Sequence, residues 1–285
     1  MTAITTARRP LRGRRIVLHV VIGLGALAMV YPIMWMFAAS LKEDSAIFSQ
    51  IGLLPPVFDF ANYAEGWNGL GEPFSTFFLN SFVIAGLAVI GNLVSCSLAA
   101  YSFARLQFRA RAFWFAIMLG TLMLPYHVTL IPQYTLFFEL GWVNTYLPLV
   151  VPKMLATDAF FIFLFVQFIR GIPRELDDAA KIDGAGPGRI YLQIVLPLLR
   201  PALVTGAIFT FLWTYNDFLS QLIYISERRL YTIPLALRAF LDSSGHSAWG
   251  PMFAMSTLAL APLIVIFILF QRQIVDGIAT SGLKG

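Results

Sequence analysis

Four polar residues stand close together inside an otherwise apolar stretch between positions 201 and 226. They are Tyr215, Asn216, Asp217 and Gln221. Amides and a carboxylate hydrogen-bond to hydroxyl groups, and an aromatic ring packs on C–H surfaces, so this set could bind a sugar in a translocation path. The same groups could instead hydrogen-bond to a neighbouring helix and hold it in place. The sequence leaves both interpretations open.

A second polar pair lies in the apolar stretch from 112 to 138. Tyr126 and Gln133 are seven residues apart, which places them on one face of a helix. Pro125 and Pro132 have the same spacing, and prolines bend a helix and free backbone carbonyls. The bend could curve the helix around a cavity that Tyr126 and Gln133 line. A kinked helix that only packs against its neighbours explains the prolines equally well.

The segment from 171 to 197 differs from its surroundings because it is polar and carries charges of both signs. Pro173 suits the first position of a helix, and the acidic residues that follow complement the positive end of the helix dipole. Gly184 is a helix stop signal. These features predict a short helix from 173 to 183.

A Gly-Pro-Gly sequence at 186–188 breaks the chain after this helix. Residues 189–196 then predict a second short amphipathic helix, which ends at Pro197. Two short helices exposed between apolar stretches have the form of a docking element for another protein.

Enzyme chemistry is not indicated. The three histidines at 19, 127 and 246 are scattered, and neither a His-Glu-x-x-His motif nor a nucleophile elbow is present. The chain has no Gly-x-x-x-x-Gly-Lys-Ser/Thr loop for ATP. Its lone Cys96 excludes a disulfide framework and a cysteine zinc site. We therefore predict a non-catalytic chain that holds no cofactor or metal of its own.

The composition predicts an integral membrane protein. Of the 285 residues, 58% are hydrophobic and 12% charged, whereas soluble domains carry about 25% charged residues. A helix needs about 20 apolar residues to cross a bilayer. The fourth of the expected spans is the least regular, because it follows Pro148 and Pro152 and carries Lys153 and Asp158. The apolar runs predict an all-helical protein with six spans, at about 16–39, 77–101, 112–138, 153–169, 201–226 and 251–270.

Basic residues set the orientation, because short cytoplasmic segments carry an excess of Lys and Arg. With both termini inside, fifteen of the twenty basic residues are cytoplasmic. We expect a cytoplasmic tail at 1–15, a single transmembrane domain at 16–285, and the segment 171–197 on the cytoplasmic side. The net charge of +5 is a modest basic excess that this positive-inside distribution explains, and nucleic acid is not an expected partner.

The cytoplasmic segment resembles a known family. Permeases of binding-protein-dependent ABC importers carry Glu-Ala-Ala, three residues, Gly, nine residues, Ile, one residue and Leu-Pro. This chain has Asp178-Ala179-Ala180, then Gly184 after three residues, and Ile194-Val195-Leu196-Pro197 after nine. Every spacing matches, and the one departure is Asp for Glu at 178. The resemblance implies a type I ABC importer permease fold with a cytoplasmic coupling helix.

The resemblance also implies partners. In the family the coupling helix sits in a groove of the ATP-binding subunit, so ATP and Mg²⁺ belong to that subunit. The implied assembly holds a second, related permease, two ATP-binding subunits and an extracytoplasmic solute-binding protein. The residues carried over to the ATPase-coupling site are Glu175, Leu176, Asp178, Ala179, Ala180, Lys181, Asp183, Gly184 and Pro197.

Other segments are similar to the smaller permease of the maltose-type carbohydrate branch. Span five carries Tyr215-Asn216-Asp217-Phe218 where that branch has Trp-Asn-Asp/Glu-Phe. The ending Gly-Leu-Lys-Gly at 282–285 resembles its Gly-x-x-x-Lys-Gly tail, with one residue in place of three between glycine and lysine. The branch implies import of a sugar or oligosaccharide into a bacterial or archaeal cell across the inner membrane. Glycerol phosphates and other polyols are the alternative substrates. An ion-coupled secondary transporter is the rival class, although only Asp217 is a clear intramembrane charge.

Three outer basic residues are candidates for docking the solute-binding protein. They are Lys42, Arg228 and Arg229. Simple solvation of a loop would also explain their charge.

Overall fold

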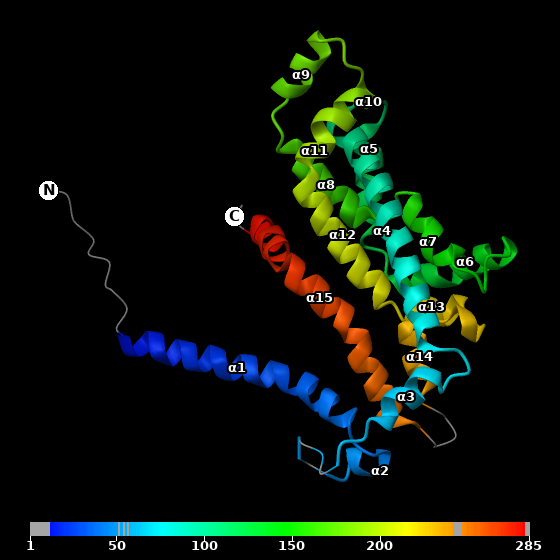
Figure 1. Ribbon diagram of the computed structural model, residues 1–285. Helices are drawn as coiled ribbons and strands as arrows, with labels where there is room; N and C mark the ends of the chain where they lie inside the picture. Colours follow the sequence, from blue (N-terminus) through cyan, green and yellow to red (C-terminus); the bar gives the residue numbers. More distant parts are fainter. Residues whose placement is uncertain (1–11, 51, 54, 56, 242–246, 283–285) are drawn as a thin grey trace. The chain divides into compact units, whose positions relative to one another are not determined.

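The computed structural model describes residues 12–50, 52–53, 55, 57–241 and 247–282. This part of the chain consists of helices and loops, without strands (Figure 1). Most of the expected N-terminal tail, residues 1–11, and most of the expected C-terminal motif, residues 283–285, lie outside the described residues. The chain divides into two compact units, Met1–Trp67 with Leu241–Thr257, and Asn68–Phe240 with Leu258–Gly285.

The first unit contains α1 (Arg12–Ala39), α2 (Asp44–Ile47), most of α3 (Ala61–Asn68) and the start of α15 (Trp249–Gly282). The residues of α1 from Arg15 to Trp35 are mostly exposed within the chain and apolar, as expected for a helix that meets lipid or another subunit.

Polar contacts fasten the loop after α1 to α3, and α2 to the start of α15. Asn62 donates from its side-chain amide to the carbonyls of Ser40 and Lys42. The backbone N–H of Gly250 donates to Oδ1 of Asp44 at 2.5 Å. Trp35 adds an edge-to-face contact with Phe253, with ring centroids 5.4 Å apart.

The second unit is built around α4 (Phe74–Arg105), a helix of 32 residues. Three helices pack on it: α7 (Leu147–Met154), α8 (Ala159–Arg170) and α12 (Arg200–Tyr215). Polar residues inside α4 have partners there, because the Asn92 amide donates to Oγ1 of Thr210 and the Ser95 hydroxyl donates to the Lys153 carbonyl. Buried polar groups are costly unless they are paired in this way.

The third expected span is not one helix. It divides into α5 (Arg111–Thr121) and α6 (Tyr126–Glu139), which are bent by 100°. Pro125 is extended at this break, with ψ of 131°. Proline has no N–H to donate to the preceding turn and disfavours helical backbone at the residue before it, so the expected kink becomes a break. Pro132 lies inside α6, as the spacing suggested.

The fourth span begins earlier than expected and is interrupted. Helix α7 starts at Leu147 because Pro148 fits into the first turn, where no N–H is needed. The chain then leaves the helix before α8, and Ala156 adopts φ of +54°. The two charged residues that made this stretch irregular pair with each other, since Lys153 Nζ lies 3.0 Å from Oδ2 of Asp158.

The fifth span is also shorter than expected. Helix α12 ends at Tyr215, and α13 (Leu219–Tyr224) follows after a break. The Asn216 amide donates back to the Leu212 carbonyl, and Oδ1 of Asp217 accepts the N–H of Ser220. Such local side-chain bonds compete with the helical backbone pattern and end the helix here. Beyond α13 come a 3₁₀ turn (Arg228–Leu230) and α14 (Ile233–Ala239).

Four helical segments of the described chain are long and apolar enough to cross a membrane: Arg15–Ala39, Phe74–Arg105, Leu147–Arg170, which consists of α7 followed by α8, and Trp249–Gln271. The count rises to six if each of two bent helix pairs is one span, the pairs being α5 with α6, and Pro187–Leu198 with α12.

Candidate docking segment and solute path

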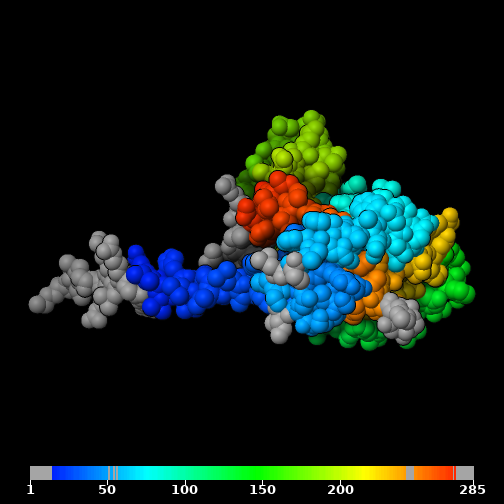
Figure 2. All heavy atoms as spheres, turned by 60° about the horizontal axis from the view of Figure 1, so that its bottom comes forward, coloured from blue at the N-terminus to red at the C-terminus, as the bar shows by residue number. Residues whose placement is uncertain are grey.

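Residues 171–198, called the docking segment below, form a projecting lobe (Figure 2). Its first helix is α9 (Glu175–Ile182), which is shorter at both ends than the expected helix from 173 to 183, since Arg174 is its N-cap and Asp183 its C-cap. Gly184 then takes φ of +77°, a left-handed conformation that glycine adopts without strain. The chain continues through α10 (Pro187–Ile190), a π-helix (Tyr191–Val195) and α11 (Leu196–Leu198).

Pro197 does not end the second helix, which was expected to stop there. It lies in the first turn of α11, and the preceding turn is wound as a π-helix in which the Leu196 N–H bonds to the Tyr191 carbonyl. The helical path therefore continues to Leu198 and then bends by 74° into α12. Prolines and π-turns are common causes of such bends.

The exposed polar residues of α9 make its surface charged. Lys181 Nζ donates to Oδ1 of Asp178 at 2.8 Å. This hydrogen bond and the charge of Lys181 lower the pKa of Asp178 below its ordinary value. Asp178 is therefore ionised at neutral pH. Glu175, Asp183 and Gly184 are exposed on the same segment, as is Pro197 further along it.

The apolar residues of α9 divide between two faces. Leu176 is 42% exposed and Ala179 is also exposed, whereas Ala180 packs against the core of the second unit. Ile182 is 87% exposed, which is unusual for an isoleucine in a helix. The outward apolar face therefore consists of Leu176, Ala179 and Ile182. Ala180, one of the predicted coupling residues, therefore lies on the inner face. Ile182 was not among those residues, although it follows Ala179 by three positions and so lies on the same face of the helix.

The inner side of α9 holds an ion pair that the sequence did not reveal. Nε of Arg105, the last residue of α4, lies 3.1 Å from Oδ2 of Asp177, and only 4% and 9% of the two side chains are exposed. The Arg105 Nε–H is not aligned for a hydrogen bond to this oxygen, so the contact is ionic. Nη2 of Arg105 donates to the Ile172 carbonyl at 2.7 Å. In the sequence Arg105 is one of the fifteen expected cytoplasmic basic residues and Asp177 is one of the acidic residues that follow Pro173, and nothing in the sequence links the two.

Two residues expected in the solute path are buried inside the chain. Only 2% of Tyr215 is exposed, and its hydroxyl donates to the Ala259 carbonyl at 3.0 Å. Gln221 is 1% exposed, accepts a short hydrogen bond from Thr232, and lies with its amide nitrogen 3.4 Å from the Thr214 carbonyl. Both side chains brace neighbouring segments of the second unit.

Other predicted path residues lie at the surface of the chain. Asn216, Tyr126 and Gln133 are exposed, and Asp217 is half-buried. The hydroxyls of Tyr126 and Ser220 are 2.7 Å apart, and the Ser220 N–H donates to Asp217. Ser220, which the sequence did not single out, thus brings Tyr126 of α6 and Asp217 of span five into one polar group.

Lys42 does not form an outer docking surface. Its side chain is 2% exposed, and Nζ donates to the carbonyls of Gln50 and Gly52 at 3.1 and 2.6 Å. These backbone acceptors draw the ammonium group into the loop, so Lys42 is not available to dock the solute-binding protein as expected. Arg228 and Arg229 remain exposed, although Arg228 also donates to the Leu70 carbonyl and Arg229 pairs with Glu227.

Long apolar helices and a charged docking segment between two of them define a helical membrane protein that engages another protein. The chain belongs to the family described as "Binding-protein-dependent transport system inner membrane component", which it matches over residues 91–280. This family assignment covers the docking segment and confirms the resemblance drawn from its spacing.

Relatives and a solved structure agree with this assignment. The chain is 31% identical to the trehalose/maltose transport system permease protein MalG of Thermococcus litoralis, covering 95% of this chain and 98% of that one. It is 32% identical to the sn-glycerol-3-phosphate transport system permease protein UgpE of Yersinia pestis, covering 95% of this chain and 98% of that one. A bacterial ABC transporter involved in the import of alginate has a chain of the same fold. The TM-score is 0.81 at 21% identity, and the match covers 95% of this chain and 99% of that one.

Proposed function

We propose that this chain is one of two permease subunits of an ATP-driven importer, and that it carries a sugar or oligosaccharide delivered by an extracytoplasmic binding protein. The observation that carries the proposal is the projecting docking segment, with a free apolar face on α9 and an ordered turn at Gly184. A carrier driven by an ion gradient needs no such segment. The similarity to MalG supports a carbohydrate substrate.

The proposed assembly contains a second, related permease, two ATP-binding subunits and the binding protein. ATP and Mg²⁺ are bound and hydrolysed by the ATP-binding subunits, and this chain is non-catalytic. The positive-inside distribution supports a cytoplasmic docking segment and cytoplasmic termini in a bacterial or archaeal inner membrane. Asp217, Ser220 and Tyr126 form the part of the chain's surface best suited to meet solute hydroxyls.

The test is uptake by the complex reconstituted in liposomes with ATP inside and binding protein outside. The probes are labelled maltose and trehalose and, separately, sn-glycerol-3-phosphate. The last is included because the similarity to UgpE supports glycerol phosphate as the alternative substrate. ATP-dependent accumulation of a sugar supports the proposal. Accumulation of glycerol phosphate alone would overturn the choice of substrate. Uptake that persists without ATP under a proton or sodium gradient would overturn the importer itself.

A further inference from the structure

Three polar residues of α4 face the docking segment. Ser97, Tyr101 and Arg105 are spaced four residues apart, so they lie along one side of the helix. The Ser97 hydroxyl is 2.8 Å from that of Tyr191, and the Tyr101 hydroxyl donates to the Pro187 carbonyl at 2.9 Å.

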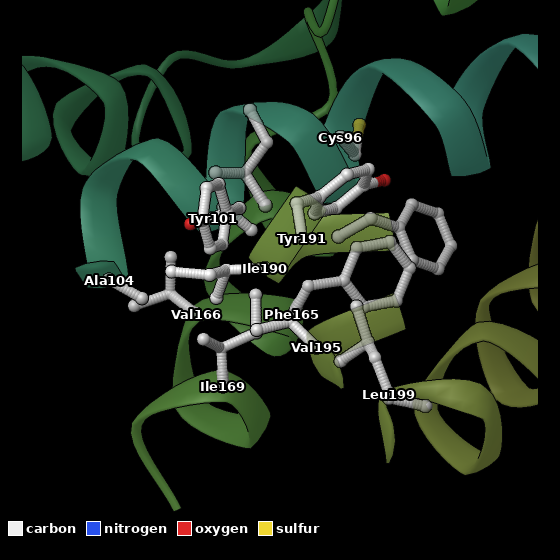
Figure 3. Packing of buried hydrophobic residues seen from close by; sticks show 14 residues of the cluster. Cys96, Tyr101, Ala104, Phe165, Val166, Ile169, Ile190, Tyr191, Val195 and Leu199 are labelled. Carbon is white, nitrogen blue, oxygen red and sulfur yellow. The ribbon is translucent and has the colours of Figure 1, made fainter. Parts of the chain in front are cut away.

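Together with Arg105, this stripe reaches three successive parts of the docking segment. Arg105 holds α9, Tyr101 holds the start of α10, and Ser97 holds the π-helix. The rings of Tyr101 and Tyr191 lie 5.2 Å apart within the same buried cluster (Figure 3). A displacement of the docking segment therefore acts directly on the C-terminal end of α4.

The opposite end of α4 holds the loop at 229–233. The Asn80 amide donates to the carbonyls of Arg229 and Tyr231, both at 2.8 Å. The N–H of Ile233 donates to the Ser81 hydroxyl at 2.9 Å. Asn80 and Arg105 are separated by roughly 37 Å of helix at 1.5 Å per residue, so one unbroken helix joins the two sites.

The covalent connection from the docking segment into α12 is less suited than α4 to transmit a displacement. It passes through the π-helix and the 74° bend before α12, and α12 ends at Tyr215. By contrast α4 is a continuous helix, packed along its length on α7, α8 and α12. Packed rigid elements are the structures that transmit a displacement between distant sites.

We infer that α4 carries the movement of the docking segment to the outer loop at 229–233, with Ser97, Tyr101 and Arg105 as positioning residues at one end and Asn80 at the other. The inference rests on the proposed function, in which the ATP-binding subunits move the docking segment. The outer loop at 229–233 would then move in response to ATP. The movement would reach it through α4 and not through the direct connection from Pro197 into α12.

The experiment places a fluorescent label on Arg229→Cys in the complete complex in nanodiscs. Cys96 is fully buried, so it stays unlabelled. The change in fluorescence on adding ATP and vanadate is measured in this background and in three further variants. Arg105→Gln/Asp177→Asn removes both charges at once, so no buried charge is left unpaired. Tyr101→Phe removes a single hydroxyl, and Ser102→Ala is the control, because the hydroxyl of Ser102, also on α4, donates to the Leu98 carbonyl of the same helix.

We expect the double variant to reduce the ATP-dependent change about threefold or more, Tyr101→Phe to reduce it less, and Ser102→Ala to leave it unchanged. Co-purification of the ATP-binding subunits shows that each complex has assembled. A full-sized change in the double variant and in Tyr101→Phe would overturn the inference, while uptake by the unaltered complex would still support the proposed function. An unaltered complex without ATP-dependent uptake would overturn both.

Discussion

The guanidinium of Arg105 and the carboxylate of Asp177 form a buried ion pair between the end of α4 and the first turn of α9, with Nε and Oδ2 3.1 Å apart. Removing one partner leaves the other charge buried and unpaired, which costs about 3–5 kcal/mol. Replacing both with apolar residues removes that cost. The pair is therefore expected to show strong thermodynamic coupling.

A double-mutant cycle measures this coupling. Arg105→Met and Asp177→Leu should each lower the thermal midpoint of the purified complex strongly, and the double variant should recover most of the loss. Additive effects of the two substitutions would show that the residues do not act as a pair.

The backbone at Gly184 predicts a strain effect. A β-carbon at Gly184 would meet open space, so no steric clash with other residues is expected. Because φ is +77°, a β-branched residue would still destabilise this conformation by about 1–2 kcal/mol. Gly184→Val should reduce ATP-driven uptake, and Gly184→Asn should reduce it less, because asparagine tolerates this conformation. Gly186→Val is the matched control, since Gly186 also has open space but φ of −76°. Equal losses in all three variants would rule out strain as the cause.

The exposed face of α9 predicts where the ATP-binding subunit docks. Ala179→Glu and Ile182→Asp place a carboxylate on this apolar face and should reduce co-purification of that subunit about tenfold or more, as expected for hot-spot positions. Both variants should still insert into the membrane. Ala180→Glu should instead destabilise the chain, because Ala180 packs inward. Normal co-purification with Ala179→Glu and Ile182→Asp would place the dock elsewhere.

The pair of Asp178 and Lys181 predicts a pH response. The folded pKa of Asp178 is lowered, so the stabilisation from this contact is present above the ordinary value of 3.8 and is lost as the pH falls through the lowered pKa. Lys181→Met should raise the pKa of Asp178 toward its ordinary value, and Lys181→Arg should keep it low. A carboxyl ¹³C titration of the labelled complex measures both. An unchanged midpoint in Lys181→Met would contradict the assignment.

The sequence predicts three of the long helices well because their signals are continuous. Helices α1, α4 and α15 each contain a long apolar run, and their bounds differ from expectation mainly by extra turns. The other expected spans break at single residues, such as Pro125 and Asn216, whose local bonds override apolar character. Hydropathy averaged over about 19 residues does not detect such local events.

The candidate site also contains features that the sequence predicts and features that only the fold reveals. The docking helix and its glycine stop are local signals and could be predicted. The ion pair of Arg105 and Asp177 joins distant parts of the chain, so only the fold reveals it. Tyr215 and Gln221 could not be assigned to path or packing from sequence, because a polar side chain that packs inward and one that faces solute have the same sequence pattern.

Helices α4 and α7 approach each other closely at Gly91 of α4, whereas Gly86 of the same helix faces open space. A β-carbon at Gly91 would lie 2.6 Å from Cγ of Met154 and 3.3 Å from its backbone, whereas one at Gly86 would meet nothing within 4 Å. Gly91→Ala should therefore destabilise the complex by about 1–3 kcal/mol through overpacking. Gly86→Ala should stabilise it by about 0.5–1 kcal/mol, because alanine favours helix more than glycine does. Thermal unfolding of the two variants checks the difference in sign. Stabilisation by Gly91→Ala would mean that α4 and α7 are not held together at this point in the assembled transporter.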